Sequence, residues 1–196
     1  MKKNTLITLL IFFYTFDIFA NEPKFDQIIN GLDNPWSLTF VNNDELLITE
    51  KSGNLLLVNL SNKNIGKIEH NLNILEDGQG GLLEVLYYKD QVFVSYTEDQ
   101  KKGYSSTSVA KGEFNDLELN FQNIFSAKPP INSGYHFGSR LVIKDDFIYI
   151  TAGERGEGMI AQDPKKHPGS IIRIHLDGKI PKDNPKFIDK KDWLPE

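Results

Sequence analysis

One histidine of the chain lies in a setting that suits proton transfer. His136 occurs in the segment Gly134-Tyr135-His136-Phe137-Gly138, directly before an expected strand. Glycine has no side chain, so the backbone around this histidine can come close to a ligand. A neutral imidazole, with an ordinary pKa of about 6.5, accepts a proton at neutral pH. We therefore predict that His136 is a catalytic base, and the alternative is a loop histidine that only forms hydrogen bonds.

A carboxylate that could orient this histidine follows at the far end of the expected strand pair. Glu154 lies in the polar turn Gly153-Glu154-Arg155-Gly156. A carboxylate bonded to one imidazole nitrogen determines which of the two nitrogens carries the proton. We predict that Glu154 is the catalytic partner of His136. The alternative is a solvated turn residue that pairs with Arg155 or Lys165.

A second glycine-rich loop carries a glutamine. Gln79 is surrounded by Gly78, Gly80 and Gly81, which again permit close approach of a ligand. A turn that only needs glycine would explain the glycines but would leave the glutamine unexplained. We therefore favour a binding role for Gln79.

Strands are expected to position these loops, because apolar residues alternate with polar ones and long helical patterns are missing. The segments 39–49, 85–95 and 141–151 align without gaps, and each contains a polar turn with an aspartate: Asp44, Asp90 and Asp146. Further strands are expected at residues 55–60, 107–112 and 170–176, with fourth strands within 66–75 and 119–126.

Four antiparallel strands that recur every 40 to 50 or so residues are typical of β-propeller blades. A plain β-sandwich is the alternative, but it does not account for the recurring turn. We predict an all-β β-propeller with about three blades. Because propellers close with typically four to eight blades, we expect the chain to be the truncated first half of a longer protein.

The first 20 residues have the order of a secretory signal peptide. Lys2 and Lys3 precede an apolar stretch that ends at Ala20, the expected cleavage site. A membrane anchor is the alternative, but a spanning helix needs roughly 20 apolar residues and Asp17 interrupts this stretch. We expect residues 1–20 to be removed and 21–196 to form the N-terminal part of the propeller domain, periplasmic or secreted, with no membrane span after cleavage.

Composition limits the function classes. The formal net charge of −5 becomes about −6 without residues 1–20, because two lysines and one aspartate are lost. Nucleic-acid binding depends on basic patches, so we expect no nucleic-acid partner. The chain contains no cysteine, so a hydrophobic core and not disulfides must stabilise the fold.

Seven segments, in this order, resemble the soluble aldose sugar dehydrogenases, the glucose/sorbosone dehydrogenase family that uses pyrroloquinoline quinone (PQQ). They are GLDNPWSL (31–38), LLITE (46–50), GQGGLL (78–83), HFGSRL (136–141), GERG (153–156), AQD (161–163) and DGKIPKDNP (177–185). The resemblance implies a six-bladed propeller. It also implies oxidation of the anomeric hydroxyl of an aldose to a lactone, with hydride transfer to PQQ and an external electron acceptor.

The resemblance also implies residue roles. His136 matches the family's catalytic base, which also touches the cofactor, and Gln79 matches a glutamine that reaches cofactor and substrate. Glu154 matches the carboxylate that supports the base, where the family usually has aspartate. Tyr135 stands where glucose-oxidising relatives can have an acidic, sugar-binding residue, so glucose is in doubt as substrate. A calcium ion is implied, with ligands mostly beyond residue 196 and no metal ligand named in this chain.

Two alternatives belong to other function classes. One is a non-catalytic propeller that binds a carbohydrate or a protein, because propellers host many functions. The other is a calcium-dependent lactonase, which would need central carboxylate and asparagine ligands that this half does not show. For residues 1–196 alone we expect no activity, because the implied cofactor site is incomplete.

Overall fold

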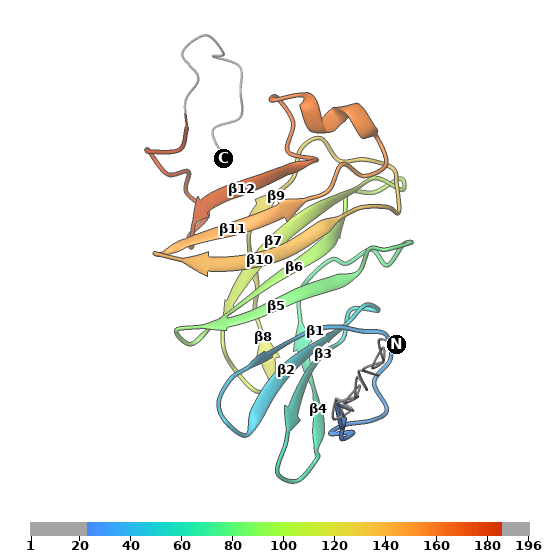
Figure 1. Ribbon diagram of the computed structural model, residues 1–196, viewed down its shortest axis with the longest axis vertical. Coiled ribbons are helices and arrows are strands. Elements are labelled where there is room, and N and C mark those ends of the chain that lie inside the picture. The colour runs from blue at the N-terminus through green and yellow to red at the C-terminus, as the bar shows by residue number, and fades with distance from the viewer. Residues whose placement is uncertain (1–22, 186–196) are drawn as a thin grey trace, which may run out of the picture.

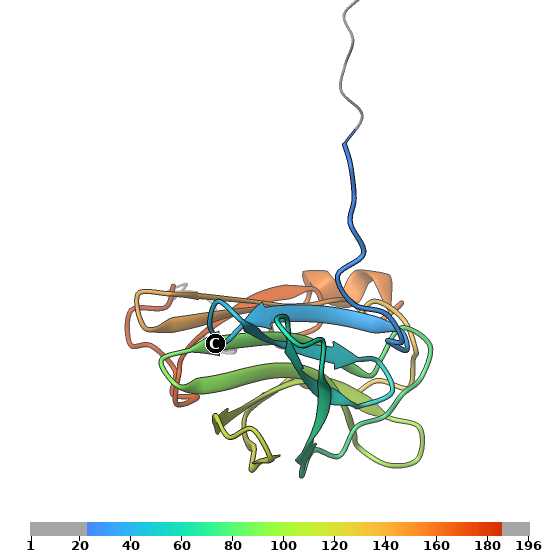
Figure 2. The same cartoon turned by 90° about the horizontal axis from the view of Figure 1, so that it is seen from below.

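The structure is a computed structural model that describes residues 23–185. The signal peptide predicted for residues 1–20 lies outside the described residues and stays a prediction. Within the described range, no helix is long and apolar enough to cross a membrane. The segment that begins at residue 23 extends away from the sheets (Figure 2), and Ile29 and Leu32 then pack against the first sheet.

Apart from the short 3-10 helix η1 (Gly158–Gln162), the described secondary structure consists of strands in three sheets, named here blades 1 to 3 (Figure 1). Blade 1 contains β1 (Pro35–Phe40), β2 (Glu45–Glu50), β3 (Leu55–Asn59) and β4 (Ile65–His70), with the short β8 (Glu118–Leu119) parallel to β4. Blade 2 contains β5 (Leu82–Tyr88), β6 (Gln91–Asp99), β7 (Ser105–Glu113) and β9 (Gln122–Ser126). Blade 3 contains β10 (Gly138–Lys144), β11 (Phe147–Ala152) and β12 (Ser170–His175). The predicted all-β propeller with about three blades is confirmed.

The blades pack face to face through two apolar cores. Between blades 1 and 2 the buried residues include Leu47, Leu55, Val92 and Val94. Between blades 2 and 3 they include Phe93, Val109, Ile148, Ile150 and Ile172. Successive residues of β6 therefore point into different cores, which explains why this strand is apolar on both faces.

In two of the three blades, the same tight turn joins the first strand to the second. Lys89 and Asp90, with φ of 50° and 60°, join β5 to β6, and Asp145 and Asp146, with φ of 52° and 62°, join β10 to β11. Positive φ at both central residues is the geometry of a type I′ turn, whose twist suits a two-residue hairpin. The predicted turns at Asp90 and Asp146 are confirmed.

Blade 1 departs from this repeat by one residue. Thr39 lies opposite Leu47, whereas Leu86 lies opposite Phe93. Because Leu47 and Phe93 are equivalent in the repeat, Thr39 corresponds to Leu86 and not to Val85. The gapless alignment of residues 39–49 with 85–95 is therefore wrong by one residue in the first strand, since the loop between β1 and β2 is one residue longer.

Equivalent hydroxyl residues of the second strands in blades 1 and 2, Thr49 and Ser95, have a structural role. Thr49 Oγ1 donates to the carbonyl oxygen of Leu83 in blade 2, over 2.5 Å. Ser95 Oγ donates to the carbonyl oxygen of Ser139 in blade 3, over 2.6 Å. Both hydroxyl residues are fully buried, so these bonds fix how neighbouring blades are aligned.

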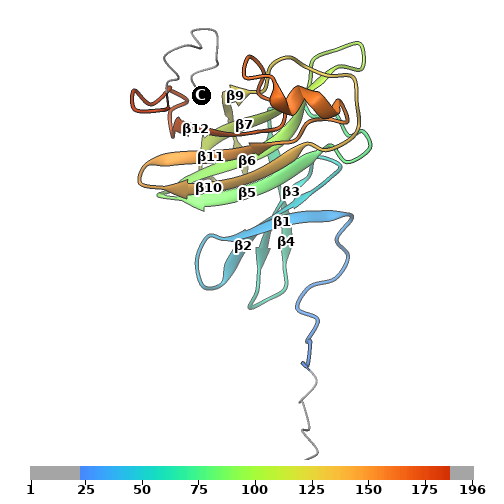
Figure 3. The same cartoon turned by 45° about the horizontal axis from the view of Figure 1, so that its top comes forward.

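The first strands of the blades, β1, β5 and β10, lie next to one another and run in the same direction (Figure 1). The loops that precede β5 and β10, with Gln79 and His136, therefore meet on one side of the molecule. The helix η1 lies on the same side (Figure 3). The repeat thus brings together residues that are far apart in sequence.

Candidate active site

The loops before β5 and β10 are joined through Gln79. Its backbone N–H donates to the carbonyl oxygen of Gly134 over 2.7 Å, and its side-chain Oε1 accepts from the backbone N–H of His136 over 2.8 Å. A Cβ at Gly78 would lie 2.4 Å from the carbonyl oxygen of Gly134, so this close approach requires glycine. The structure therefore brings together two of the three predicted site residues through direct contact.

The backbone of His136 is held in an uncommon conformation. Its φ is 50°, in the left-handed region that non-glycine residues seldom occupy. The end of β11 presses against it, because a Cβ at Gly153 would lie 1.8 Å from the carbonyl oxygen of His136. Gly153 also donates its N–H to the carbonyl oxygen of Phe137 over 3.1 Å. Such conformations persist where the surroundings determine them, and they cluster at functional sites.

The third predicted residue contacts the imidazole itself. Glu154 Oε1 is hydrogen-bonded to Nδ1 of His136, and it also accepts the backbone N–H of Gly156 over 3.3 Å. The pKa of Glu154 lies below its ordinary value, mainly because of the hydrogen bond with His136. Backbone hydrogen bonds lower this pKa further. An ionised carboxylate only accepts hydrogen bonds, so Nδ1 carries the proton, and the neutral imidazole has its lone pair on Nε2.

The imidazole is open to a ligand. The side chain of His136 is 53% exposed and that of Glu154 is 29% exposed. The ring of Tyr135 lies next to that of His136, with 6.2 Å between the ring centroids. In this arrangement the carboxylate fixes the orientation of the imidazole, and the second ring nitrogen can chemically accept a proton.

Arg140 and Trp36, whose places in the sequence suggest a residue bridging blades and a residue packing within a blade, have a joint structural role. Arg140 Nη1 donates to Glu84 Oε2 over 2.6 Å, and its guanidinium lies 4.2 Å from the ring centroid of Trp36. Ser37 Oγ donates to the other oxygen of Glu84 over 3.0 Å. This cluster joins the first strands of all three blades. Glu84 was not predicted from the sequence as a member of such a cluster. The feature that could have indicated it is a single acidic residue within an otherwise apolar strand.

The remaining histidines lie elsewhere. His70 Nε2 is 2.7 Å from the carbonyl oxygen of Gly53, and the ring of His175 lies 4.8 Å from that of Phe147. His167 is only 5% exposed, and its Nδ1 accepts the backbone N–H of Lys128 over 2.8 Å. The sequence gives these three histidines no metal-ligand spacing and suggests surface or strand-edge positions for them, which is wrong for the buried His167. Among residues 23–185, no group of three or more His, Cys, Asp or Glu side chains could hold a metal ion.

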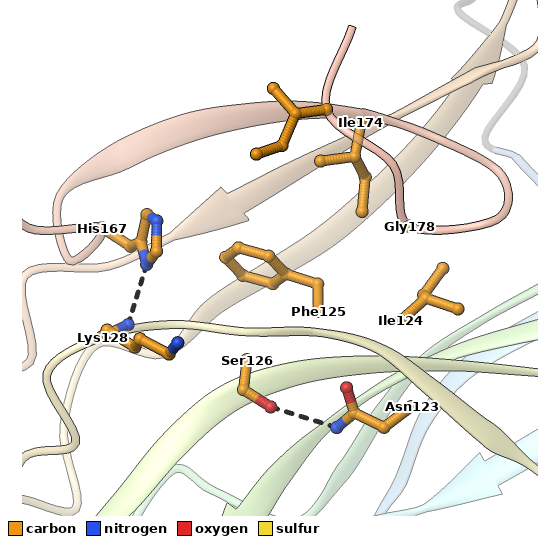
Figure 4. Close-up of a pocket in the computed structure, with 9 residues that line it drawn as sticks. Asn123, Ile124, Phe125, Ser126, Lys128, His167, Ile174 and Gly178 are labelled. Carbon is orange, nitrogen blue, oxygen red and sulfur yellow. Dashed lines mark hydrogen bonds between the residues drawn. The ribbon is translucent and has the colours of Figure 1, made fainter. Parts of the chain in front are cut away.

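A cavity of about 380 Å³ lies between the outer strands of blades 2 and 3 (Figure 4). Phe125 and Ser126 of β9 border it on one side, and Ile174 of β12 borders it on the other. None of the predicted site residues lines it. The cavity is therefore separate from the candidate site, which is an open surface between loops.

Comparison with known proteins identifies the family of the chain. The family described as Glucose / Sorbosone dehydrogenase matches residues 32–196. Aldose sugar dehydrogenase YliI of Escherichia coli K12 is 32% identical over 164 residues, which are 79% of this chain and 44% of that protein. Quinoprotein glucose dehydrogenase B of Acinetobacter calcoaceticus is 26% identical over 206 residues, which are 86% of this chain and 43% of that protein.

Solved structures show the same likeness. A crystal structure of a glucose dehydrogenase superimposes with a TM-score of 0.83 at 33% identity, over 89% of this chain and 53% of that one. The apo-form of the E. coli aldose sugar dehydrogenase gives a TM-score of 0.81 at 30% identity, over 87% of this chain and 52% of that one. The chain thus spans about half the length of these relatives. It belongs to the glucose/sorbosone dehydrogenase family.

Proposed function

We propose that this chain contributes the catalytic base of a PQQ-dependent dehydrogenase that oxidises the anomeric hydroxyl of aldose sugars to a lactone. One observation carries the proposal: the hydrogen bond between Glu154 and Nδ1 of His136, which leaves Nε2 to accept a proton. Membership of the family supports a dehydrogenase acting on sugars. The cofactor, the lactone product and the residue roles are the finer parts of the proposal.

The names of relatives support the choice of cofactor. One curated relative is called a quinoprotein glucose dehydrogenase, and a structure of an aldose sugar dehydrogenase from Streptomyces coelicolor is described as PQQ-bound. The second is only 20% identical, so by itself it shows the shared fold. PQQ as the cofactor of this protein is inferred from these relatives together with the site.

The site has groups that fit such a cofactor. Gln79 uses Oε1 to hold the N–H of His136, which leaves its amide NH₂ to donate to a ligand oxygen. The glycines on either side of Gln79 allow close approach, and the His136 side chain is more than half exposed. We propose that Gln79 and His136 hold the cofactor. Calcium is different, because the described residues offer no metal cluster, and no step is assigned to it.

The chemistry follows from the proton positions. Glu154 keeps the proton on Nδ1, so Nε2 of His136 takes the proton of the sugar hydroxyl. The imidazolium that forms is stabilised by the adjacent carboxylate, as in other carboxylate–histidine pairs. Oxidation also removes a hydride from the anomeric carbon, and PQQ supplies the acceptor for it when bound. The chain's own residues thus bind, orient and move the proton.

The proposal covers the residues that this chain contributes. Since the chain spans about half the length of its relatives, residues 1–196 alone are expected to be inactive. Tyr135 lies beside His136, where the resemblance leads us to expect an acidic residue in glucose-oxidising relatives, so the proposal names aldoses as a class and not glucose. Export to the periplasm or the medium is proposed from the predicted signal peptide.

The test uses the full protein, including any residues encoded after position 196. PQQ and calcium are added, and reduction of an artificial electron acceptor is followed with a panel of aldoses. The proposal expects turnover with aldoses that requires PQQ. Absence of turnover, together with absence of PQQ binding, would favour a non-catalytic binding propeller.

A further inference from the structure

A buried arginine lies directly beside the His136 loop. Arg155 follows Glu154 in the turn after β11 and is only 3% exposed. A charged side chain is seldom fully buried unless hydrogen-bond partners compensate for the loss of water. Its partners therefore show what this residue does in the fold.

The guanidinium binds the backbone of the loop that carries His136. Nε donates to the carbonyl oxygen of Tyr135 over 3.0 Å, and Nη2 donates to the carbonyl oxygen of Ser133. On its far side, Nη1 and Nη2 donate to the carbonyl and hydroxyl oxygens of Ser105 over 3.1 and 2.9 Å. The guanidinium carbon also lies 3.6 Å from the ring centroid of Phe137. Arg155 thus ties the loop to β7.

Arg155 contacts the residues directly before and directly after His136 in the sequence. Tyr135 and Phe137 are its two neighbours, and Arg155 holds the carbonyl of one and the ring of the other. The loop needs such anchors because His136 has a φ of 50°, outside any regular structure. The preceding residue, Glu154, holds the imidazole ring. One dipeptide therefore fixes both the backbone and the side chain of the histidine.

Burial has an electrostatic consequence. It lowers the pKa of Arg155 to about 10, and the nearby Asp77 opposes this effect. The group therefore stays charged at neutral pH, and its hydrogen bonds remain charge-assisted. A lysine would keep the charge but would lose the planar fork that reaches two carbonyls at once.

We propose that Arg155 is a positioning residue for His136: it holds the residues on both sides of the histidine so that Nδ1 meets Glu154. The functional meaning of this rests on the proposed role of His136 as the base. The positioning itself is a property of the folded chain and can be measured without cofactor or sugar.

The test compares Arg155→Lys with a matched control, Arg173→Lys. Arg173 is also stacked on an aromatic ring, Phe147 at 3.7 Å, and it also forms a fork, but with Asp183 and Asn184. Thermal unfolding reports the loss of stability in each variant. Long-range ¹H–¹⁵N NMR of the ring, assigned with His136→Gln, reports which nitrogen of His136 carries the proton.

The proposal expects the Nδ1–H form of His136 to dominate in the wild type and in Arg173→Lys. In Arg155→Lys this population shifts toward the mixture of free histidine, even at temperatures where the variant is folded. Addition of methylguanidinium to Arg155→Ala is expected to restore the wild-type ring signals. An unchanged His136 tautomer in folded Arg155→Lys would overturn the proposal.

A milder variant covers the case in which Arg155→Lys does not fold. Ser105→Ala removes only the hydroxyl partner on the far side of the guanidinium. It is expected to shift the His136 signals in the same direction but less, and no shift would count against the proposal. Failure of the proposed enzyme function would appear differently, as turnover that survives His136→Gln, with these NMR results unaffected.

Discussion

Glu154 and His136, 18 residues apart in the chain, are joined by a hydrogen bond between Oε1 and Nδ1. Glu154 lies just after the end of β11, and His136 lies just before the start of β10. This bond determines the tautomer of the histidine, whose side chain is 53% exposed. The carboxylate is one methylene longer than the aspartate that the family resemblance implies at this position. Its contact with the ring shows that the glutamate reaches the position that the pairing needs.

Removing the negative charge of Glu154 should lower the activity of His136 as a base more than shortening its side chain by one methylene. We expect Glu154→Gln to lower kcat by about 10²-fold or more, the scale of general-base catalysis, because an amide can bond Nδ1 but does not stabilise an imidazolium. Glu154→Asp is the matched control and should keep most of the activity. Steady-state kinetics of both variants, made in the full protein with PQQ and calcium present, check this, and equal losses in the two would refute the charge argument.

The same carboxylate should link stability to pH. The pKa of Glu154 is lowered in the folded state, first by the bond from His136. Its stabilising contribution is therefore complete above the unfolded-state pKa and is lost as the pH falls through the folded-state value. Denaturant unfolding should show Glu154→Gln less stable than wild type at pH 7, with the difference gone at acidic pH. A difference independent of pH would contradict this linkage.

Gly153 should tolerate no side chain. An added Cβ would lie 1.8 Å from the carbonyl oxygen of His136, which belongs to the backbone and cannot turn away as a flexible side chain can. We expect Gly153→Ala to cost about 1–3 kcal/mol, as overpacking does, and to displace the histidine. Gly66→Ala is the control, because the nearest atom there is 3.9 Å away. Similar unfolding free energies for the two variants would contradict the close approach.

The Arg140–Glu84 pair should matter for stability although the arginine is 60% exposed. Glu84 is only 10% exposed, and Arg140→Met leaves its carboxylate with less compensation. We expect a loss of about 1.5–3 kcal/mol, the scale of a hydrogen bond to a charged group. Lys89→Met, which breaks a well-exposed pair with Asp146, should cost less than about 1 kcal/mol. Chemical unfolding of the two variants decides between these values.

Much of this arrangement could be predicted from sequence. Alternation of apolar residues marks strands, and the repeated turn at Asp90 and Asp146 marks blades, so the propeller followed. The repeat also places the loops before equivalent strands side by side, which brings Gln79 to His136. These inferences need only local patterns and the repeat.

Other features depend on packing that local patterns do not encode. The register of β1 differs by one residue because of a single extra loop residue, and a gapless alignment hides it. Arg155 looked like a surface partner of Glu154, yet it is buried because its partners come from β7 and from the loop before β10. His167 is likewise buried by tertiary contacts.

The most direct test of the central claim is turnover by the full protein with His136 replaced by glutamine, which keeps a hydrogen-bonding side chain without an imidazole. PQQ, calcium and an aldose are present, and circular dichroism confirms that the variant is folded. We predict that kcat falls by about 10²-fold or more while PQQ binding is largely retained. Turnover close to that of the wild type would contradict the assignment of His136 as the base.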